Sequence, residues 1–205
     1  MAATPSTRHE PATRQALIRT AATAIEAGLG HSAATGPETA HLSGELGQSR
    51  ASFVTITIGG ELRGCCGTLE PVRPLVLDVW HNARASAFRD PRFRPLSAGE
   101  WRRSQLEVSV LSPCEPMIVS SEQELLLRLV PGRDGLVLAW RGMRATFLPK
   151  VWEQVAGAQE FVARLKHKAG WAAEFWAADM EAWRYETENM AVERPAELAC
   201  GASPT

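Results

Sequence analysis

The apolar and polar positions of the chain alternate between helical and strand-like periods. Residues 12–29 place apolar side chains four positions apart, which predicts a helix with one buried stripe. Residues 53–58 (FVTITI) are rich in β-branched side chains and alternate with a period of two, which predicts a strand. Because Gly59 and Gly60 tolerate the positive φ of a tight turn, we expect a hairpin whose second strand begins at Glu61.

The rest of the chain continues this mixture of helices and hairpins. Pro74 occupies a favoured first helical position, so the segment 75–88 is expected to be helical until Asp90 and Pro91 end it. The later elements are expected to be a strand over 105–111, a helix over 125–130, a hairpin from 136–140 to 143–148, helical segments over 150–169 and a strand over 182–187. This order predicts an α+β fold with a mostly antiparallel sheet and flanking helices.

Three segments lack such periodicity. Residues 1–11 and 191–205 are small, polar and proline-containing, and we expect them to be disordered tails on either side of a folded domain at residues 12–190. Residues 30–52 are rich in Gly, Ser and Thr and are expected to form a long loop. Loops of this length are uncommon within compact domains and are often functional or mobile.

Composition narrows the class of protein. The chain has 205 residues, of which 45% are hydrophobic, and this length allows one domain or two closely packed lobes. Its 22 basic and 23 acidic residues give a formal net charge of −1, which argues against a nucleic-acid partner or an anionic membrane surface. No apolar run approaches the ~20 residues that cross a bilayer, so a cytoplasmic protein is expected.

The segment 62–68 (LRGCCGT) carries the strongest candidate chemistry. On a regular strand, Arg63 and Cys65 project from the same face, and a guanidinium near a thiol favours the nucleophilic thiolate. Cys66 would point to the opposite face as a small core residue. Cys65 is therefore a candidate nucleophile or redox thiol, and the alternative is that both cysteines only pack in the core.

Further residues near this segment are candidates for binding a ligand. Gly64 and Gly67 leave the backbone open to close approach, or allow the strand to bulge. Asn82 is a polar residue within the predicted helix, Asp90 could simply organise the turn after that helix, and Arg92 could bind an anionic group. The candidate set for a small anionic substrate is thus Arg63, Gly64, Gly67, Asn82, Asp90 and Arg92.

A base for the thiol and a metal site are harder to find. Histidine is the usual base for a cysteine nucleophile, and His81 in the predicted helix is the candidate, although His31 and His41 could also approach Cys65 in space. The four cysteines lack the paired spacing that zinc favours, and a disulfide between adjacent residues would be strained. No nucleotide-binding or zinc-protease motif occurs, so neither a metal nor a cofactor is expected.

The segment 61–71 (ELRGCCGTLEP) resembles the L-R-G-C-I-G signature of the AMMECR-type family, whose bacterial and archaeal members are called AmmeMemoRadiSam system protein A. Cys66 stands where the family pattern usually has an aliphatic residue, which supports Cys65 as the signature cysteine. The resemblance covers nearly everything from residue 12 to about 188 and continues, in the family's order, through segments 82–83, 87–93, 106–112, 144–152 and 168–170.

This resemblance implies an α+β fold of two lobes around an antiparallel sheet, with the signature near a cleft between them. The system name implies association with a Memo-like protein and a radical SAM protein. The chain has no CxxxCxxC motif of its own, so radical chemistry would belong to a partner. Two functions stay open: an enzyme that uses Cys65 and an arginine-lined cleft for a small anionic substrate, or a non-catalytic binding or adaptor module for those partners.

Overall fold

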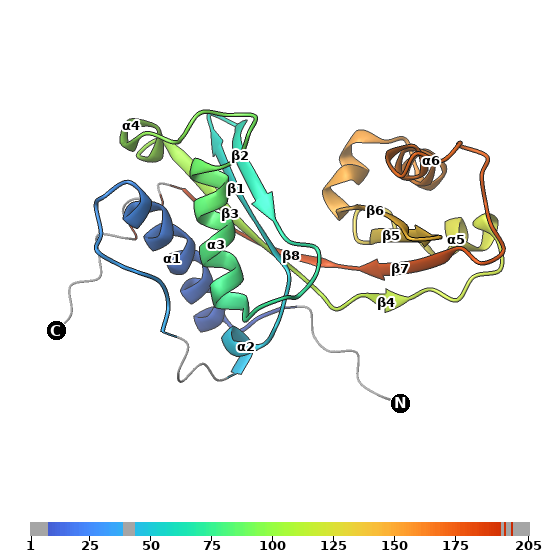
Figure 1. Ribbon diagram of the computed structural model, residues 1–205, viewed down its shortest axis with the longest axis horizontal. Coiled ribbons are helices and arrows are strands. Elements are labelled where there is room, and N and C mark those ends of the chain that lie inside the picture. Colours follow the sequence, from blue (N-terminus) through green and yellow to red (C-terminus); the bar gives the residue numbers. More distant parts are fainter. Residues whose placement is uncertain (1–7, 39–43, 194, 196–197, 199–205) are drawn as a thin grey trace. The chain divides into compact units, whose positions relative to one another are not determined.

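The computed structural model describes residues 8–38, 44–193, 195 and 198 (Figure 1). The described chain falls into two compact units. The first unit comprises the residues up to Leu111 together with those from Glu188 onward, and the second unit comprises Ser112–Thr187. Most of the two expected tails, as well as His41 and Cys200, lies outside the described residues.

The first unit is built on a four-stranded antiparallel sheet with the order β2-β1-β3-β8. Its strands are β1 (Ser52–Ile58), β2 (Glu61–Gly67), β3 (Ser104–Leu111) and β8 (Thr187–Glu193), and its helices are α1 (Pro11–Gly28), α2 (Gly44–Gly47), α3 (Leu75–Phe88) and α4 (Ala98–Trp101). The strand β2 lies at one edge of the sheet.

Helices cover one face of this sheet. Val54 and Ile56 of β1 are fully buried on that face, where they pack with Leu17 and Ile25 of α1 and with Val79 of α3. The two long helices lie on the same side of the strands in Figure 1. Because side chains alternate along a strand, the positions between the buried ones face away from α1 and α3.

The second unit has its own four-stranded antiparallel sheet with the order β4-β7-β5-β6. Its elements are β4 (Glu115–Pro116), α5 (Glu122–Arg128), β5 (Gly135–Trp140), β6 (Met143–Phe147), the 3-10 helix η1 (Pro149–Gln154), α6 (Ala158–Lys168) and β7 (Glu181–Tyr185). Leu136 and Leu138 of β5 pack against Phe161 and Leu165 of α6. The ring of Trp152 stacks on that of Phe161 with centroids 3.9 Å apart.

The α+β prediction is confirmed, and so are both hairpins. Gly59 and Gly60 have φ values of 61° and 86°, and Arg141 and Gly142 have values of 48° and 81°, as two-residue turns with positive φ require. Each unit has its own sheet, whereas the resemblance implied two lobes around one. No helix among the described residues is long and apolar enough to cross a membrane.

The strand β8 differs from the expected end of the fold. It continues to Glu193, three residues into the segment 191–205 that was expected to be a tail. Its neighbour in the sheet is β3, which is far away in the sequence. The local sequence carries weak strand signals there, and pairing with β3 supplies the hydrogen bonds that extend the strand.

Candidate functional site

The two adjacent cysteines lie on opposite faces of the first unit's sheet, as strand alternation predicts. Cys66 pairs with Val54, whose side chain faces the helices, and Cys65 pairs with Thr55 on the other face. Both cysteines are free and partly buried. Burial is the main cause that raises the pKa of the Cys66 thiol, and the nearby Asp90 carboxylate raises it further. Cys66 is therefore a packing thiol on the helix side.

A β-bulge at Arg63 separates this arginine from the thiol. Ile56 pairs with Gly64 and Thr57 with Leu62, so Arg63 is an extra residue in β2. Its guanidinium donates to Glu100 through Nε at 3.0 Å and to the carbonyl of Arg94 through Nη2 at 2.9 Å.

This ion pair replaces the expected contact between Arg63 and the thiol. Arg63 lowers the pKa of the Glu100 carboxyl to about 2, aided by the backbone N–H of Ser97. The regular strand that would have placed Arg63 beside Cys65 is not present, because the bulge turns the arginine towards Glu100.

Asp90 and Arg92 hold the backbone of Cys65 instead. The Asp90 carboxylate accepts the N–H of Cys65 at 2.9 Å, and Nη2 of Arg92 donates to the carbonyl of Cys65 at 3.2 Å. The same guanidinium donates to Asp90 at 2.7 and 3.0 Å. The hydrogen bonds from Arg92 and from the N–H of Cys65 hold the pKa of the buried Asp90 carboxyl far below its usual range.

The sulfur of Cys65 has one hydrogen-bond partner among the described residues. The hydroxyl of Thr55 donates to Sγ at 3.4 Å across the β1–β2 pair. Thr55 also pairs with Glu107 of β3, so Cys65, Thr55 and Glu107 form a row across three strands on one face of the sheet. Thiol, hydroxyl and carboxylate thus share the face that α1 and α3 leave uncovered.

The two glycines of the signature are required by internal packing. A Cβ at Gly64 would lie 2.1 Å from the carbonyl oxygen of Ser86 in α3. A Cβ at Gly67 would lie 2.3 Å from the ring of Phe53. The close approach that both glycines permit is therefore made by the protein's own helix and strand.

Ser86 also links the first two strands. Its hydroxyl accepts the N–H of Cys66 at 2.8 Å and donates to the carbonyl of Val54 at 2.7 Å. The end of α3 is consequently attached to β1 and β2 at the residue that follows Cys65.

Asn82 belongs to a separate buried cluster. Its amide donates to Asp78 at 2.8 Å and to the carbonyl of Ser52 at 3.0 Å. The same carboxylate oxygen of Asp78 accepts from Ser52 and from the hydroxyl of Thr68 at 2.8 Å, just after β2. Asn82 therefore attaches α3 to the start of β1, and Asp78 attaches it to the residue after β2; among the described residues Asn82 bonds to Ser52 and Asp78 rather than to Cys65.

The structure does not bring His81 to Cys65. His81 is exposed on α3, and α3 packs on the Val54 and Ile56 face of the sheet. Cys65 faces the other way. No group of three or more His, Cys, Asp or Glu side chains suited to a metal ion occurs in the described part of the chain.

Comparison with known proteins identifies the family. The AMMECR1 family model matches residues 18–190. The chain belongs to the AMMECR1 family. Relatives of this family include Protein MJ0810 of Methanocaldococcus jannaschii, 35% identical over 62% of this chain and 65% of that protein, so the chain spans slightly under two thirds of its length. A Thermotoga maritima protein is 37% identical over 71% of this chain and 80% of its own length.

A solved structure agrees with this family assignment. The crystal structure of the uncharacterized protein PH0010 from Pyrococcus horikoshii aligns with a TM-score of 0.79 at 30% identity. The alignment covers 91% of this chain and 94% of that chain.

Two residues of this candidate site in the AMMECR1-family protein were missed in the sequence. Thr55 and Glu107 lie in the two strands that were recognised, at the positions that alternate with the buried side chains. The alternation alone places each on the polar face of its strand. What it does not show is that β1 lies between β2 and β3, which puts both residues in register with Cys65.

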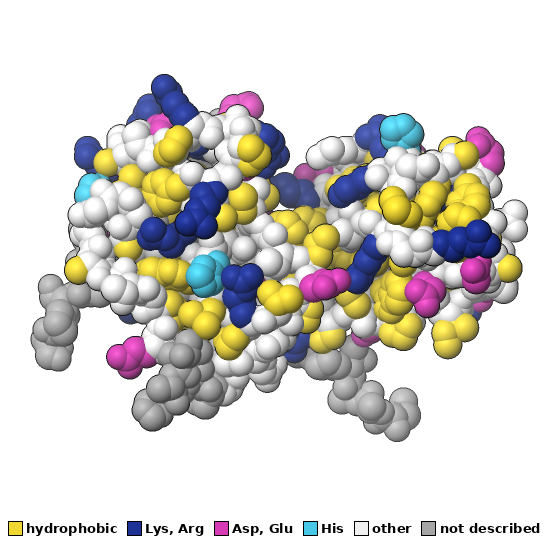
Figure 2. Space-filling view, viewed as in Figure 1, with side chains coloured by type: hydrophobic (Ala, Val, Ile, Leu, Met, Phe, Trp, Pro, Cys, Tyr) yellow, Lys and Arg dark blue, Asp and Glu magenta, His cyan; other side chains and the backbone are white. Residues whose placement is uncertain are grey.

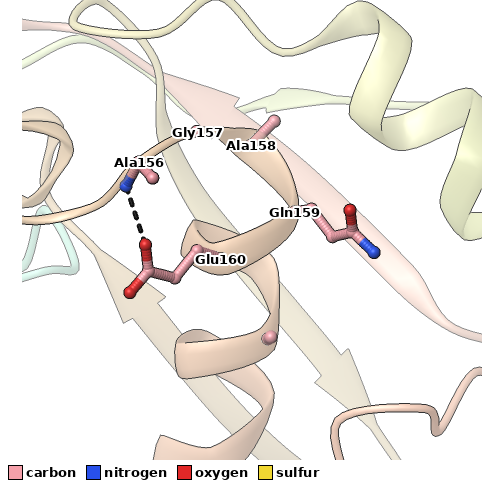
Figure 3. Close-up of a pocket in the computed structure, with 6 residues that line it drawn as sticks. Ala156, Gly157, Ala158, Gln159 and Glu160 are labelled. Carbon is pink, nitrogen blue, oxygen red and sulfur yellow. Dashed lines mark hydrogen bonds between the residues drawn. The ribbon is translucent and has the colours of Figure 1, made fainter.

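The rest of the described surface is mixed in character. Figure 2 shows basic and acidic side chains interspersed with apolar ones over the visible face. A shallow hollow at the start of α6 is lined by small residues, by Gln159 and by Glu160, whose carboxylate accepts the N–H of Ala156 at 2.7 Å (Figure 3). Because that carboxylate also pairs with Arg164, this hollow offers little chemistry of its own.

Proposed function

We propose that this AMMECR1-family protein binds a small anionic ligand on the sheet face around Cys65, and that Cys65 acts on it as a nucleophile or redox thiol. The observation that carries the proposal is the fixation of Cys65 at three atoms. Asp90 holds its N–H, Arg92 holds its carbonyl and Thr55 holds its sulfur. Such positioning from elements far apart in sequence is what a reactive group requires.

The neighbours of the sulfur suit a nucleophile. Thr55 directs a hydroxyl proton at Sγ, and the Arg92 guanidinium lies next to the thiol's residue, where it donates to the carbonyl of Cys65. A hydrogen-bond donor and a cation are the groups that support a thiolate during attack. Cys65 remains partly exposed, so a reagent can reach it.

The preference for an anion rests on the arginines next to the site. Arg89, Arg92 and Arg94 are exposed, whereas Asp90, the acid between them, is buried and already paired with Arg92. The segment 89–94 therefore presents more positive than negative charge to solvent. A carboxylate or phosphate would be attracted to it and could accept hydrogen bonds from a guanidinium.

Alkylation of a protein that keeps only Cys65 tests the proposal. In a background with Cys66, Cys114 and Cys200 changed to Ser, we expect iodoacetamide to modify Cys65 about tenfold faster than a thiol placed by Thr57→Cys in the Cys65→Ser protein. Position 57 is a matched control because its side chain lies on the same face of the sheet as Thr55 and Cys65. Thr55→Val should slow the alkylation of Cys65. Equal alkylation rates at positions 65 and 57 would exclude a reactive role for Cys65.

Alkylating reagents that differ in charge test whether the site prefers an anionic ligand. We expect Arg92→Gln to slow the reaction of Cys65 with anionic iodoacetate more than with neutral iodoacetamide. Arg19→Gln, an exposed change on α1, should leave the ratio of the two rates unchanged. A ratio that is insensitive to Arg92→Gln would remove the anionic ligand from the proposal while leaving the thiol in it.

One observation favours a second candidate, a binding or adaptor module that works with Memo-like and radical SAM proteins. Among the described residues, the sulfur of Cys65 accepts its hydrogen bond from a hydroxyl, and His81 lies on a helix that covers the other face of the sheet. A thiol whose hydrogen-bond partner is a hydroxyl rather than a histidine suits binding better than acid–base chemistry. Turnover of extract metabolites that is lost in Cys65→Ala would contradict this second candidate.

A further inference from the structure

The second unit contains a hollow of about 480 Å³ that the Cys65 site does not use. It lies beside the beginning of α5, the middle of α6 and the segment 173–176. Hollows of roughly 300–1,000 Å³ are of the size that binds small molecules. Its charged lining residues are Glu122 and Glu174, and no lysine or arginine lines it.

Glu122 is held in position by a buried cation. Nζ of Lys166 donates to the two carboxylate oxygens of Glu122 at 2.8 and 2.9 Å and to the carbonyl of Phe175 at 3.2 Å. The Lys166 side chain is fully buried, whereas that of Glu122 is 24% exposed. Because a carboxylate has about four acceptor positions, Glu122 keeps some of them for a ligand in the hollow.

The charges at the hollow do not cancel. Lys166 compensates Glu122, but Glu174 is exposed and forms no ion pair with another described residue. One negative charge is therefore left over at the rim. It attracts a cation and disfavours a carboxylate or phosphate.

The remaining wall is apolar, aromatic or amide in character. Leu126 and Ala163 face the hollow from the two helices, and the indole of Trp176 borders it. An indole face attracts a cation, while the aliphatic side chains suit a short hydrocarbon body. Gln159 adds a carboxamide to this wall and points away from Glu160 in Figure 3.

We propose that this hollow binds a primary aliphatic amine as its ammonium ion, with the charged group at Glu122 and Glu174 and the hydrocarbon chain against Leu126, Ala163 and Trp176. A free alkylamine and a lysine side chain of a peptide share this chemistry. The proposal is independent of Cys65, since its residues all belong to the second unit.

Titration calorimetry with n-pentylamine, 1-pentanol and pentanoate on the full chain tests the ligand class at pH 7. The three probes match in length and differ in charge. We expect pentylamine to bind at least about tenfold more tightly than either of the others. Equal binding of pentanol would show a purely apolar hollow, and tighter binding of pentanoate would reverse the charge preference; either result overturns the proposal.

Three variants locate the binding. Glu174→Gln should weaken pentylamine binding several-fold, and Ala163→Phe should abolish it by filling the hollow without changing any charge. Glu181→Gln, an exposed change elsewhere in the same unit, should leave binding unchanged. The thermal unfolding midpoint of each variant verifies that it folds, and binding that survives both Glu174→Gln and Ala163→Phe would overturn the proposal.

A capped lysine distinguishes the two sources of the amine. If Nα-acetyl-lysine methylamide binds as tightly as pentylamine, the hollow accepts lysine side chains of peptides. Binding of pentylamine alone would support a free amine as the ligand. Failure of both amines would overturn the proposal and leave the Cys65 site unaffected.

Discussion

The carboxylate of Asp90 accepts the backbone N–H of Cys65 at 2.9 Å, although the two residues are 25 positions apart. The helix α3 returns the chain to the edge of the sheet, so the segment after it lies beside β2. Asp90 and Arg92 thereby satisfy the outward-pointing backbone groups of an edge strand. This arrangement both protects the edge from pairing with another chain and fixes the signature cysteine.

Asp90→Asn should destabilise the protein by about 1–3 kcal/mol at pH 7, because a buried charge-assisted contact to Arg92 and Cys65 is lost. The folded state lowers the pKa of Asp90, so its stabilisation is complete above the unfolded value of about 3.9 and is lost as the pH falls below it. Urea denaturation should show that the difference in free energy of unfolding between the wild-type protein and Asp90→Asn shrinks between pH 5 and pH 3. Glu61→Gln, an exposed change, is the control, and a pH-independent difference would contradict this account.

Gly64→Ala should cost about 2–4 kcal/mol, because the new methyl group would overlap the backbone carbonyl of Ser86, which cannot rotate away. Gly99→Ala in α4 is the matched control: nothing lies within 4 Å of its Cβ position, and a helical position favours alanine. Thermal unfolding should show a lower midpoint for the first variant and an unchanged or higher midpoint for the second. Equal midpoints would mean that α3 does not pack as tightly on β2 as the distance indicates.

We expect the two substitutions that remove one partner of the Lys166–Glu122 ion pair to lower the free energy of unfolding by different amounts. Glu122→Gln leaves a fully buried ammonium group without its counter-charge, which costs about 3–5 kcal/mol. Lys166→Met fills the same space with an apolar side chain and leaves Glu122 with access to water, so we expect a loss of about 1 kcal/mol or less. Chemical denaturation measures both, and a larger loss for Lys166→Met would show that the carboxylate is the more deeply buried charge.

Cys66 should react slowly with alkylating reagents. Burial and the charge of Asp90 raise the pKa of its thiol, so little thiolate exists at pH 7.5. In a protein with Cys65 and Cys200 changed to Ser, exposed Cys114 serves as the control within the same molecule. Peptide mapping should show Cys66 modified about tenfold more slowly than Cys114 in the folded protein. The two rates should become similar in concentrated urea, and similar rates without urea would show that Cys66 is not buried.

Local sequence signals accounted for most of the first unit's elements. Proline before an apolar segment and Asp-Pro after it predicted the helix at 75–88, and the structure has α3 at the same bounds. Ser97 and Glu100 have the spacing of a capping box in the sequence, and they form its reciprocal bonds at α4. The expected strand at 182–187 corresponds to β7, whereas β8 was not predicted, because its residues carry weak strand propensity and depend on pairing with β3.

Lys166 shows where local pattern fails in the second unit. The run 166–168 looks like a solvated basic face, and His167 and Lys168 are indeed exposed. Lys166 is nevertheless fully buried, because Glu122 of another helix provides its counter-charge. A partner 44 positions away cannot be inferred from helical spacing.

The sequence by itself determined that Cys65 and Cys66 point to opposite faces of a strand, because side chains alternate wherever the backbone is extended. It also determined the family, through the residues around that pair. Only the tertiary structure decided which arginine contacts Cys65. The bulge turns Arg63 to Glu100, and the return of the chain after α3 brings Asp90 and Arg92 to the strand edge. Those contacts depend on strand register and helix packing, which arise between segments distant in sequence.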